Sequence, residues 1–278
     1  MLIPCEGAVY SNAKFWEELK KNPMEAEPIT KTIVAEVLNR QWNHLRSLCP
    51  SLPEEVKILS IIDEDLKDTY ILAWASKSME LKNKSWVPTL HTPGFTDYDF
   101  IIGVNPDIPN GWFTGTDCKN IGWRYDLSTV MTHELLHGIG ISTSINSDYT
   151  LGYFFNGKCY PTLFDEKIQN NDGTYVVDGC QYTGTPGEDL YVNGIQLYHP
   201  SPFKKGSSLS HHNEPGHVMH ASIAPRRCMD LRHNEFKLLE AMDVSCPVIG
   251  HTSDALIETY GVPLLVILFI VIVLDFTF

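Results

Sequence analysis

The first half of the chain carries the clearest hydrophobic patterns. Between Thr30 and Leu48 apolar residues recur at helical spacing, which predicts an amphipathic helix that packs against a sheet. Residues 12–21 predict a second, shorter helix. Apolar runs rich in β-branched residues predict strands at 56–62, 69–75 and 100–104. Residues 63–68 are expected to turn, and residues 76–97 to form a loop or a weakly marked strand.

The second half has a different pattern. Residues 144–210 are rich in Gly, Asn, Asp, Tyr and Pro and contain few helical runs. Short strands or turns are expected at 160–166 and 173–179, and a hairpin at 188–197. A helical pattern returns at 234–242.

These elements predict an α+β fold. The N-terminal lobe, 12–140, is expected to hold a twisted mixed sheet with a backing helix and a second helix that carries the chemistry described below. An irregular C-terminal lobe, 141–250, would face it across a cleft, where a peptide would align along an exposed sheet edge. Residues 1–11 and 251–278 are expected to flank this domain as an N-terminal segment and as a spacer with an apolar tail.

Composition and charge narrow the class of protein. The 278 residues are 43% hydrophobic and 20% charged, as in globular proteins with a substantial core. The net charge is −13, and no stretch rich in Lys or Arg is visible, since adjacent basic residues form only isolated pairs. We therefore expect no nucleic-acid partner, because such proteins carry a basic stripe or patch. The sequence does not indicate an oligomeric state.

Seven cysteines favour an oxidising compartment. They are widely spaced and form no C-x-x-C pair, which fits a few disulfides and one free thiol in an extracellular or cell-surface protein. Proximity in the sequence suggests the pairs Cys159–Cys180 and Cys228–Cys246. The alternative is seven reduced cysteines in a cytosolic protein. A single sequon at Asn83 would be a glycan site in a secreted chain.

The C-terminal tail suggests membrane attachment. Residues 262–274 are strongly apolar but fall short of the ~20 residues that a spanning helix needs. Their length suits the tail of a lipid-anchor signal, with small residues at 253–255 as the attachment site. A tail anchor or a buried terminal segment are the alternatives. A lipid anchor requires secretion, so we expect a signal to precede Met1.

The chemistry centres on the stretch from Val130 to Gly140, which contains an H-E-x-x-H motif. His133 and His137 are four residues apart, so both imidazoles project from one helical face and can bind one metal ion. Glu134 lies beside them, where it can act as general base on a metal-activated water. A polar start at 126–128 is expected to cap the helix, and Gly138 and Gly140 to end it.

A catalytic zinc needs a third protein ligand. The compact spacing H-E-x-x-H-x-x-G-x-x-H would place it at residue 143, but that residue is Thr143, a poor ligand. The 206–220 segment is rich in histidine and offers four candidates farther along the chain: His211, His212, His217 and His220. In a second scheme, a glutamate from a later helix, Glu235 or Glu240, completes the site.

With these features the chain resembles the leishmanolysin-like branch of the metzincin zinc peptidases, which carries a long insertion before the third histidine. The resemblance covers about residues 99–246. It implies a zincin fold with one catalytic Zn²⁺, held by His133, His137 and a third histidine, for which His211 is the first choice and His212 and His217 are the reserves. It also implies a chain-redirecting turn at Gly140 and a methionine beneath the metal, matched by Met219 with Met229 in reserve.

The expected function is therefore a zinc endopeptidase that cleaves protein or peptide substrates, with Glu134 as general base. A catalytically inactive surface or adhesion protein on the same scaffold is the alternative from a different class. A zinc hydrolase acting on other bonds is a further alternative.

Overall fold

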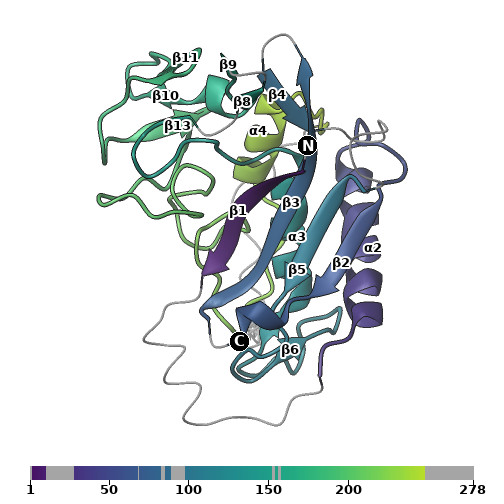
Figure 1. Ribbon diagram of the computed structural model, residues 1–278. Coiled ribbons are helices and arrows are strands. Elements are labelled where there is room, and N and C mark those ends of the chain that lie inside the picture. Colours follow the sequence, from purple (N-terminus) through teal and green to yellow (C-terminus); the bar gives the residue numbers. More distant parts are fainter. Residues whose placement is uncertain are drawn as a thin grey trace, which may run out of the picture. The chain divides into compact units, whose positions relative to one another are not determined.

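The computed structural model describes residues 2–10, 28–67, 69–82, 85–88, 98–151, 154–155 and 158–247 (Figure 1). The chain divides by its contacts into two units, Met1–Cys246 and Pro247–Phe278. Three predictions lie outside the described residues: the helix at 12–21, the sequon at Asn83 and the apolar tail. The fold is α+β, with a mixed sheet packed against helices and small irregular sheets in the C-terminal part.

The main sheet is built by the first hundred residues. Its strands are β1 (Leu2–Tyr10), β2 (Ile58–Ile62), β3 (Ile71–Lys82), β4 (Ser85–Pro88) and β5 (Phe100–Val104). They lie in the order β1-β3-β5-β2, and β4 pairs with the far end of β3. Strand β2 runs parallel to β5, and the other pairs are antiparallel. The sheet is therefore mixed, as expected.

The strands differ from the sequence pattern mainly in β3. The pattern predicted an end at Ala75, but β3 continues to Lys82, and β4 follows within the segment expected to be a loop. The reason is tertiary: Ser76 and Lys77 pair with β5 on one side and with β1 on the other, so ladder hydrogen bonds hold them extended despite their polarity. Residues 2–10 likewise join this sheet as β1.

Two helices cover one face of the sheet (Figure 1). The long amphipathic pattern forms α2 (Lys31–Leu48), whose first turn is capped by Thr30. The motif helix is α3 (Leu127–Ile139). Phe100 of β5 lies between them, because its ring packs edge-on against Trp42 of α2, with ring centroids 6.1 Å apart. On its other side a Cβ at Gly138 would lie only 2.8 Å from that ring. Glycine there thus allows α3 to approach the sheet closely.

Short elements make up the rest. The turn after β2 contains the 3₁₀ helix η1 (Glu64–Leu66), and strands β6 (Trp112–Phe113) and β7 (Tyr125–Asp126) pair before α3. The C-terminal part consists of β8 (Phe154–Phe155), β9 (Lys158–Cys159), η2 (Asp165–Lys167), β10 (Gln169–Asn170), β11 (Val177–Asp178), β12 (Gln181–Tyr182), β13 (Leu190–Val192), β14 (Ile195–Gln196) and α4 (His233–Ala241).

The predicted C-terminal elements are confirmed in outline. Strands β13 and β14 form the hairpin expected at 188–197, and α4 is the helix expected at 234–242. Strand β11 falls within 173–179, whereas 160–166 leads into η2 rather than into a strand.

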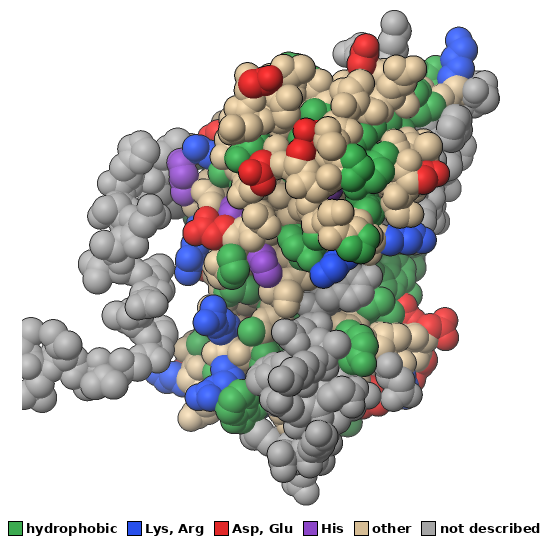
Figure 2. Space-filling view, turned by 90° about the vertical axis from the view of Figure 1, so that its left-hand side faces the viewer, with side chains coloured by type: hydrophobic (Ala, Val, Ile, Leu, Met, Phe, Trp, Pro, Cys, Tyr) green, Lys and Arg blue, Asp and Glu red, His purple; other side chains and the backbone are tan. Residues whose placement is uncertain are grey.

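On the face drawn in Figure 2, Asp and Glu side chains are scattered over the upper part of the view.

The described part of the chain contains three disulfides, two of which join distant parts of the sequence. Cys159–Cys180 is confirmed, but the predicted pair Cys228–Cys246 is wrong. Cys246 instead bonds Cys49 at the end of α2, and Cys228 bonds Cys118 in the loop before α3. Sequence proximity failed because α4 separates the two C-terminal cysteines while the fold brings each one to the N-terminal half.

These disulfides suggest an extracellular or secreted protein. Among the described residues, no helix combines the length and the apolar character needed to cross a bilayer.

Candidate metal centre

Helix α3 places two histidines side by side at the centre of the fold. Its N-terminus is fixed by Asp126, whose carboxylate accepts hydrogen bonds from the Thr129 amide at 2.9 Å and from the Thr129 hydroxyl at 2.6 Å. Its C-terminus lies at Gly140, whose φ of +136° is a backbone conformation that residues with a side chain rarely adopt. Between these limits His133 and His137 are both fully buried.

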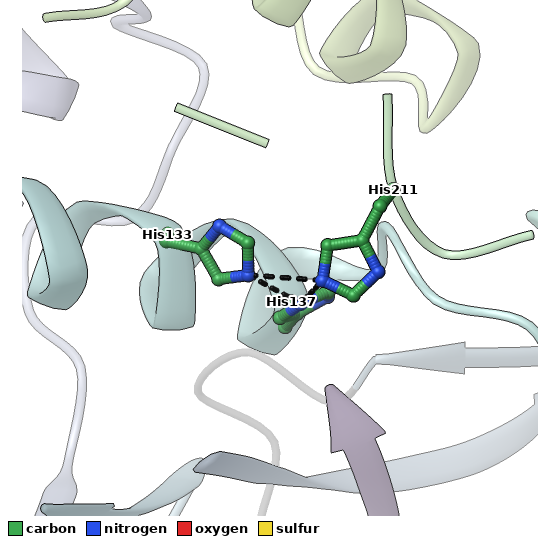
Figure 3. Close-up of side chains that lie close together, drawn as sticks. All are labelled: His133, His137 and His211. Atoms are coloured by element: carbon green, nitrogen blue, oxygen red, sulfur yellow. Dashed lines mark hydrogen bonds between the residues drawn. The ribbon is translucent and has the colours of Figure 1, made fainter. Parts of the chain in front are cut away.

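The imidazole of His211 lies beside these two, although it follows His137 by 74 residues in the sequence. The Nε2 atoms of His133 and His137 lie 3.0 Å apart, and the Nε2 atom of His211 lies 3.1 Å from the first and 3.3 Å from the second. Figure 3 shows the three rings pointing toward one another, with His211 approaching α3 from a separate segment. The three histidines form a buried group that can hold a metal ion.

Each ring is oriented by its other nitrogen. Nδ1 of His133 donates to the Val218 carbonyl at 2.6 Å, Nδ1 of His137 to the Ile141 carbonyl at 2.6 Å, and Nδ1 of His211 to the Ser207 carbonyl at 2.8 Å. A carbonyl only accepts, so every Nδ1 carries the proton of the neutral ring. All three Nε2 lone pairs consequently face a common point.

This donor set fits a metal ion. Neutral imidazoles protonated at Nδ1 present no proton on Nε2, so three lone pairs at this separation repel one another unless a cation lies between them. Tetrahedral zinc with Zn–N distances of about 2.0–2.1 Å needs ligand nitrogens about 3.3–3.4 Å apart. The observed separations of 3.0–3.3 Å approach that value.

Burial keeps the rings neutral. Desolvation lowers the pKa of His133 to about 4, although its bond to Val218 and the charge of Glu235 act in the opposite direction. Burial also lowers the pKa of His137 and of His211 well below the usual value, and the neighbouring imidazoles add to that effect. Metal ligation requires neutral imidazole, so these environments favour the ligating form.

The segment that carries His211 is held by the hairpin β13–β14. The His211 carbonyl accepts from the Tyr198 amide at 2.8 Å, and the Asn213 amide donates to the Gln196 carbonyl at 3.0 Å. The backbone is extended here, so consecutive side chains point to opposite sides. His211 therefore faces α3, whereas His212 faces away from it.

The reserve histidines form a different group. The rings of His212 and His217 stack, with centroids 4.3 Å apart and planes inclined by 11°. His212 Nδ1 accepts from the Glu214 amide at 2.7 Å. These two imidazoles and the Glu214 carboxylate place ligand atoms within 4.8 Å of one another. Parallel stacked rings direct their lone pairs side by side rather than to one point, so this group lacks the convergence of the first.

The other predicted site residues occupy distinct places. Met219 is fully buried and follows Val218, which orients His133. Met229 instead bonds Thr129 through its backbone, at the opposite end of α3 from the second histidine.

Glu235 is buried and accepts hydrogen bonds from His217 and from backbone amides, and Glu240 is exposed. Neither glutamate belongs to the three-histidine group.

Thr143 has a structural role. Its hydroxyl donates to the buried Asp165 carboxylate at 2.6 Å. The same carboxylate accepts from the Ser144 hydroxyl at 2.6 Å and from the Thr162 amide at 2.9 Å. Asp165 therefore ties the chain just after α3 to the segment around Thr162. Thr143 thus anchors part of the long segment between α3 and His211.

Glu134 lies on α3 between the two histidines and is fully buried. On a helix it is offset by about 60° from His137 and about 100° from His133. It therefore flanks the face that carries the two ligands, within the same buried region.

Sequence patterns missed Lys77. This buried residue of β3 donates from Nζ to the His137 carbonyl at 3.2 Å and also bonds the Ser142 hydroxyl. A cation at the C-terminal end of a helix is favourable, and here it fixes the turn that carries Ile141, the partner of His137. A single lysine in a segment expected to be a loop gave no signal of this role.

The geometry is compatible with a metal-dependent hydrolase. Comparison of the chain with protein-family models, with curated proteins and with solved structures finds no match.

Proposed function

We propose that this protein is a zinc-dependent endopeptidase of the metzincin type. The observation that carries the proposal is the convergence of three buried, Nδ1-protonated imidazoles, two of them flanking Glu134 on one helix. Three nitrogen ligands leave one position open, as catalytic zinc sites do. The turn at Gly140 and the long insertion before His211 support the leishmanolysin-like arrangement.

The bound Zn²⁺ would supply Lewis-acid polarisation of the scissile carbonyl and lower the pKa of water. His133, His137 and His211 hold it through Nε2, and their Nδ1–H bonds fix the ring orientations. Glu134 accepts a proton from the attacking water and then transfers it to the leaving amine, since the amine departs only when protonated. Burial of Glu134 lowers the local dielectric, which would strengthen its electrostatic interactions within the site.

Substrate and location belong to the same proposal. The substrate is a protein or peptide, and no nucleic acid is involved. The protein acts outside the cell or at its surface, and we propose that the apolar tail, residues 262–274, attaches it to a membrane. The disulfides support an extracellular location.

The replacement Glu134→Gln tests the proposed activity. It keeps the size of the side chain but removes the base, so zinc content should stay at one ion per chain while cleavage of a quenched casein substrate falls by at least about a hundredfold. Glu36→Gln, an exposed change on α2, serves as the matched control. A wild-type chain that binds zinc but cleaves neither protein nor ester substrates would instead support the inactive surface-protein alternative. Cleavage of esters alone would indicate another zinc hydrolase.

A further inference from the structure

The carbonyl that orients His133 belongs to a peptide group with a second, charged partner. The Val218 carbonyl accepts the His133 Nδ1–H at 2.6 Å. The amide of the same peptide unit is the Met219 N–H, which donates to Glu235 Oε1 at 3.4 Å. One peptide group thus connects a buried carboxylate on α4 to a candidate metal ligand on α3.

The other two imidazoles have no such connection among the described residues. The peptide that carries the Ile141 carbonyl donates through the Ser142 amide to the Gly140 carbonyl at 2.7 Å. The peptide that carries the Ser207 carbonyl donates through the Ser208 amide to the Lys204 carbonyl at 2.8 Å. Both of those acceptors are neutral, whereas the acceptor behind His133 is a carboxylate.

Glu235 is built into the fold as an ionised group. It is fully buried, and its carboxylate also accepts from the Arg232 amide at 3.0 Å and from His217 Nδ1 at 3.2 and 3.3 Å. Burial alone would raise the pKa of Glu235, but the bonds and charge of His217 and the backbone amides lower it below the usual value. The charge is therefore present at neutral pH.

The turn 217–219 also contacts the segment that carries the third histidine. The Met219 carbonyl accepts from the His212 amide at 2.7 Å, directly after His211. Glu235 holds this turn from both ends, through His217 and through the Met219 amide. The carboxylate on α4 is consequently placed to fix the backbone beside two of the three imidazoles.

We propose that Glu235 is a positioning residue that tunes His133 through the Val218–Met219 peptide group. A hydrogen bond from the amide to an anion polarises the peptide, so its carbonyl oxygen becomes a stronger acceptor for Nδ1–H. A stronger bond at Nδ1 raises the basicity of the ligating nitrogen, as a carboxylate bonded directly to a zinc-ligating histidine does. The inference rests on the metal centre and requires no peptidase activity.

Zinc affinity is the first test. Glu235→Gln keeps the shape of the side chain but removes its charge, and it should weaken Zn²⁺ binding by about 10–100-fold in a chelator competition, the usual effect of losing such a partner. Glu235→Asp retains the charge and should restore the affinity to within a few-fold of wild type. Glu240→Gln, an exposed glutamate on the same helix, is the matched control and should change nothing.

Proton NMR of the imidazole N–H groups in the zinc-loaded protein distinguishes an effect on His133 alone from a general loss of structure. In Glu235→Gln the His133 Nδ1–H proton should shift, while those of His137 and His211 stay in place, because their peptide groups end on neutral carbonyls. If Glu235→Gln does not fold, Glu235→Asp serves. Its shorter side chain lengthens the bond to the Met219 amide but keeps the charge, so zinc affinity should fall by no more than a few-fold and any shift should be confined to the His133 proton.

Two results would overturn the proposal. One is zinc affinity in Glu235→Gln within twofold of wild type. The other is an equal shift of all three imidazole protons, which would indicate a general structural role. Because neither readout involves peptide cleavage, a failure here leaves the proposed activity untouched. Loss of cleavage in Glu134→Gln likewise says nothing about Glu235.

Discussion

At the scale of single residues, the candidate centre depends on which ring nitrogen carries a proton. Three backbone carbonyls, from Ile141, Ser207 and Val218, select the same tautomer in all three rings. A histidine that is merely buried needs only one such partner and no convergence of its second nitrogen. The common orientation of three Nε2 atoms is therefore the feature that distinguishes a metal site from three core histidines.

Neighbouring histidines on one extended segment allow a matched test of the third ligand. His211→Asn should weaken zinc binding roughly a hundredfold or more, since one ligand of such a site contributes about 3 kcal/mol. His212→Asn, one residue further on, should leave the affinity within about threefold, because that ring faces the other side. The zinc dissociation constants of both variants can be measured by chelator competition. The assignment is wrong if His212→Asn loses zinc and His211→Asn retains it.

At the scale of elements, the position of α3 is set by the absence of a side chain at residue 138. The ring of Phe100 fills the space that a Cβ would enter. This contact fixes the distance of the helix from β5, and hence the place of His137, the residue directly before Gly138. A glycine that the sequence suggested as a helix end is thus a packing residue, and Gly140 alone terminates the helix.

Gly138→Ala should accordingly lower both stability and zinc affinity. An added methyl 2.8 Å from an aromatic ring in the core forces α3 outward, at a cost of about 1–3 kcal/mol. Urea unfolding of the zinc-free protein measures this loss. As a control, Gly194→Ala adds a methyl where nothing lies within 4 Å, although its positive φ adds local strain. Equal unfolding free energies for wild type and Gly138→Ala would contradict the packing argument.

The elements that the sequence predicts well are those with local signals. Helix α2 has a regular apolar stripe and a threonine cap, and α3 has an aspartate cap and a terminal glycine. The extension of β3 and the joining of β1 to it depend on partners far along the chain, which no local pattern records. For the same reason His133 and His137 followed from one motif, whereas His211 required the resemblance to a family.

At the scale of the whole molecule, the candidate site joins two distant parts of the chain. Helix α3 belongs to the sheet-bearing half, and His211 follows a long segment that Asp165 anchors to the residues just after α3. The disulfides Cys49–Cys246 and Cys118–Cys228 connect the same two halves. The covalent links and the proposed metal therefore restrain one interface, so metal binding and global stability should be coupled.

The stability of the zinc-free protein should depend on pH. The sign of this dependence follows from the lowered pKa values of the buried histidines. In the unfolded chain each histidine titrates near 6.5, but in the fold burial lowers the pKa of His133 to about 4. The stabilising effect of the neutral ring is complete above about pH 6.5 and is lost as the pH falls toward 4. His133 alone should remove about 2 kcal/mol between pH 7 and 5 in the zinc-free protein, and the lowered pKa values of His137 and His211 should act in the same direction.

Urea unfolding in the presence of a chelator, at a series of pH values, measures this slope. The triple replacement of His133, His137 and His211 by Asn is the control, and its stability should fall much less steeply over the same interval. Identical slopes for the wild type and the triple variant would show that the three rings titrate in the fold as they do in the unfolded chain, so that burial does not lower their pKa values.

The central claim is that one zinc ion binds at the point where three imidazoles converge. A crystal structure of the zinc-loaded protein, with anomalous scattering measured at the zinc edge, tests it most directly. The account predicts a single strong peak about 2.0–2.1 Å from the Nε2 atoms of His133, His137 and His211. A peak bound by His212 and His217 instead, or no peak near α3, would contradict it.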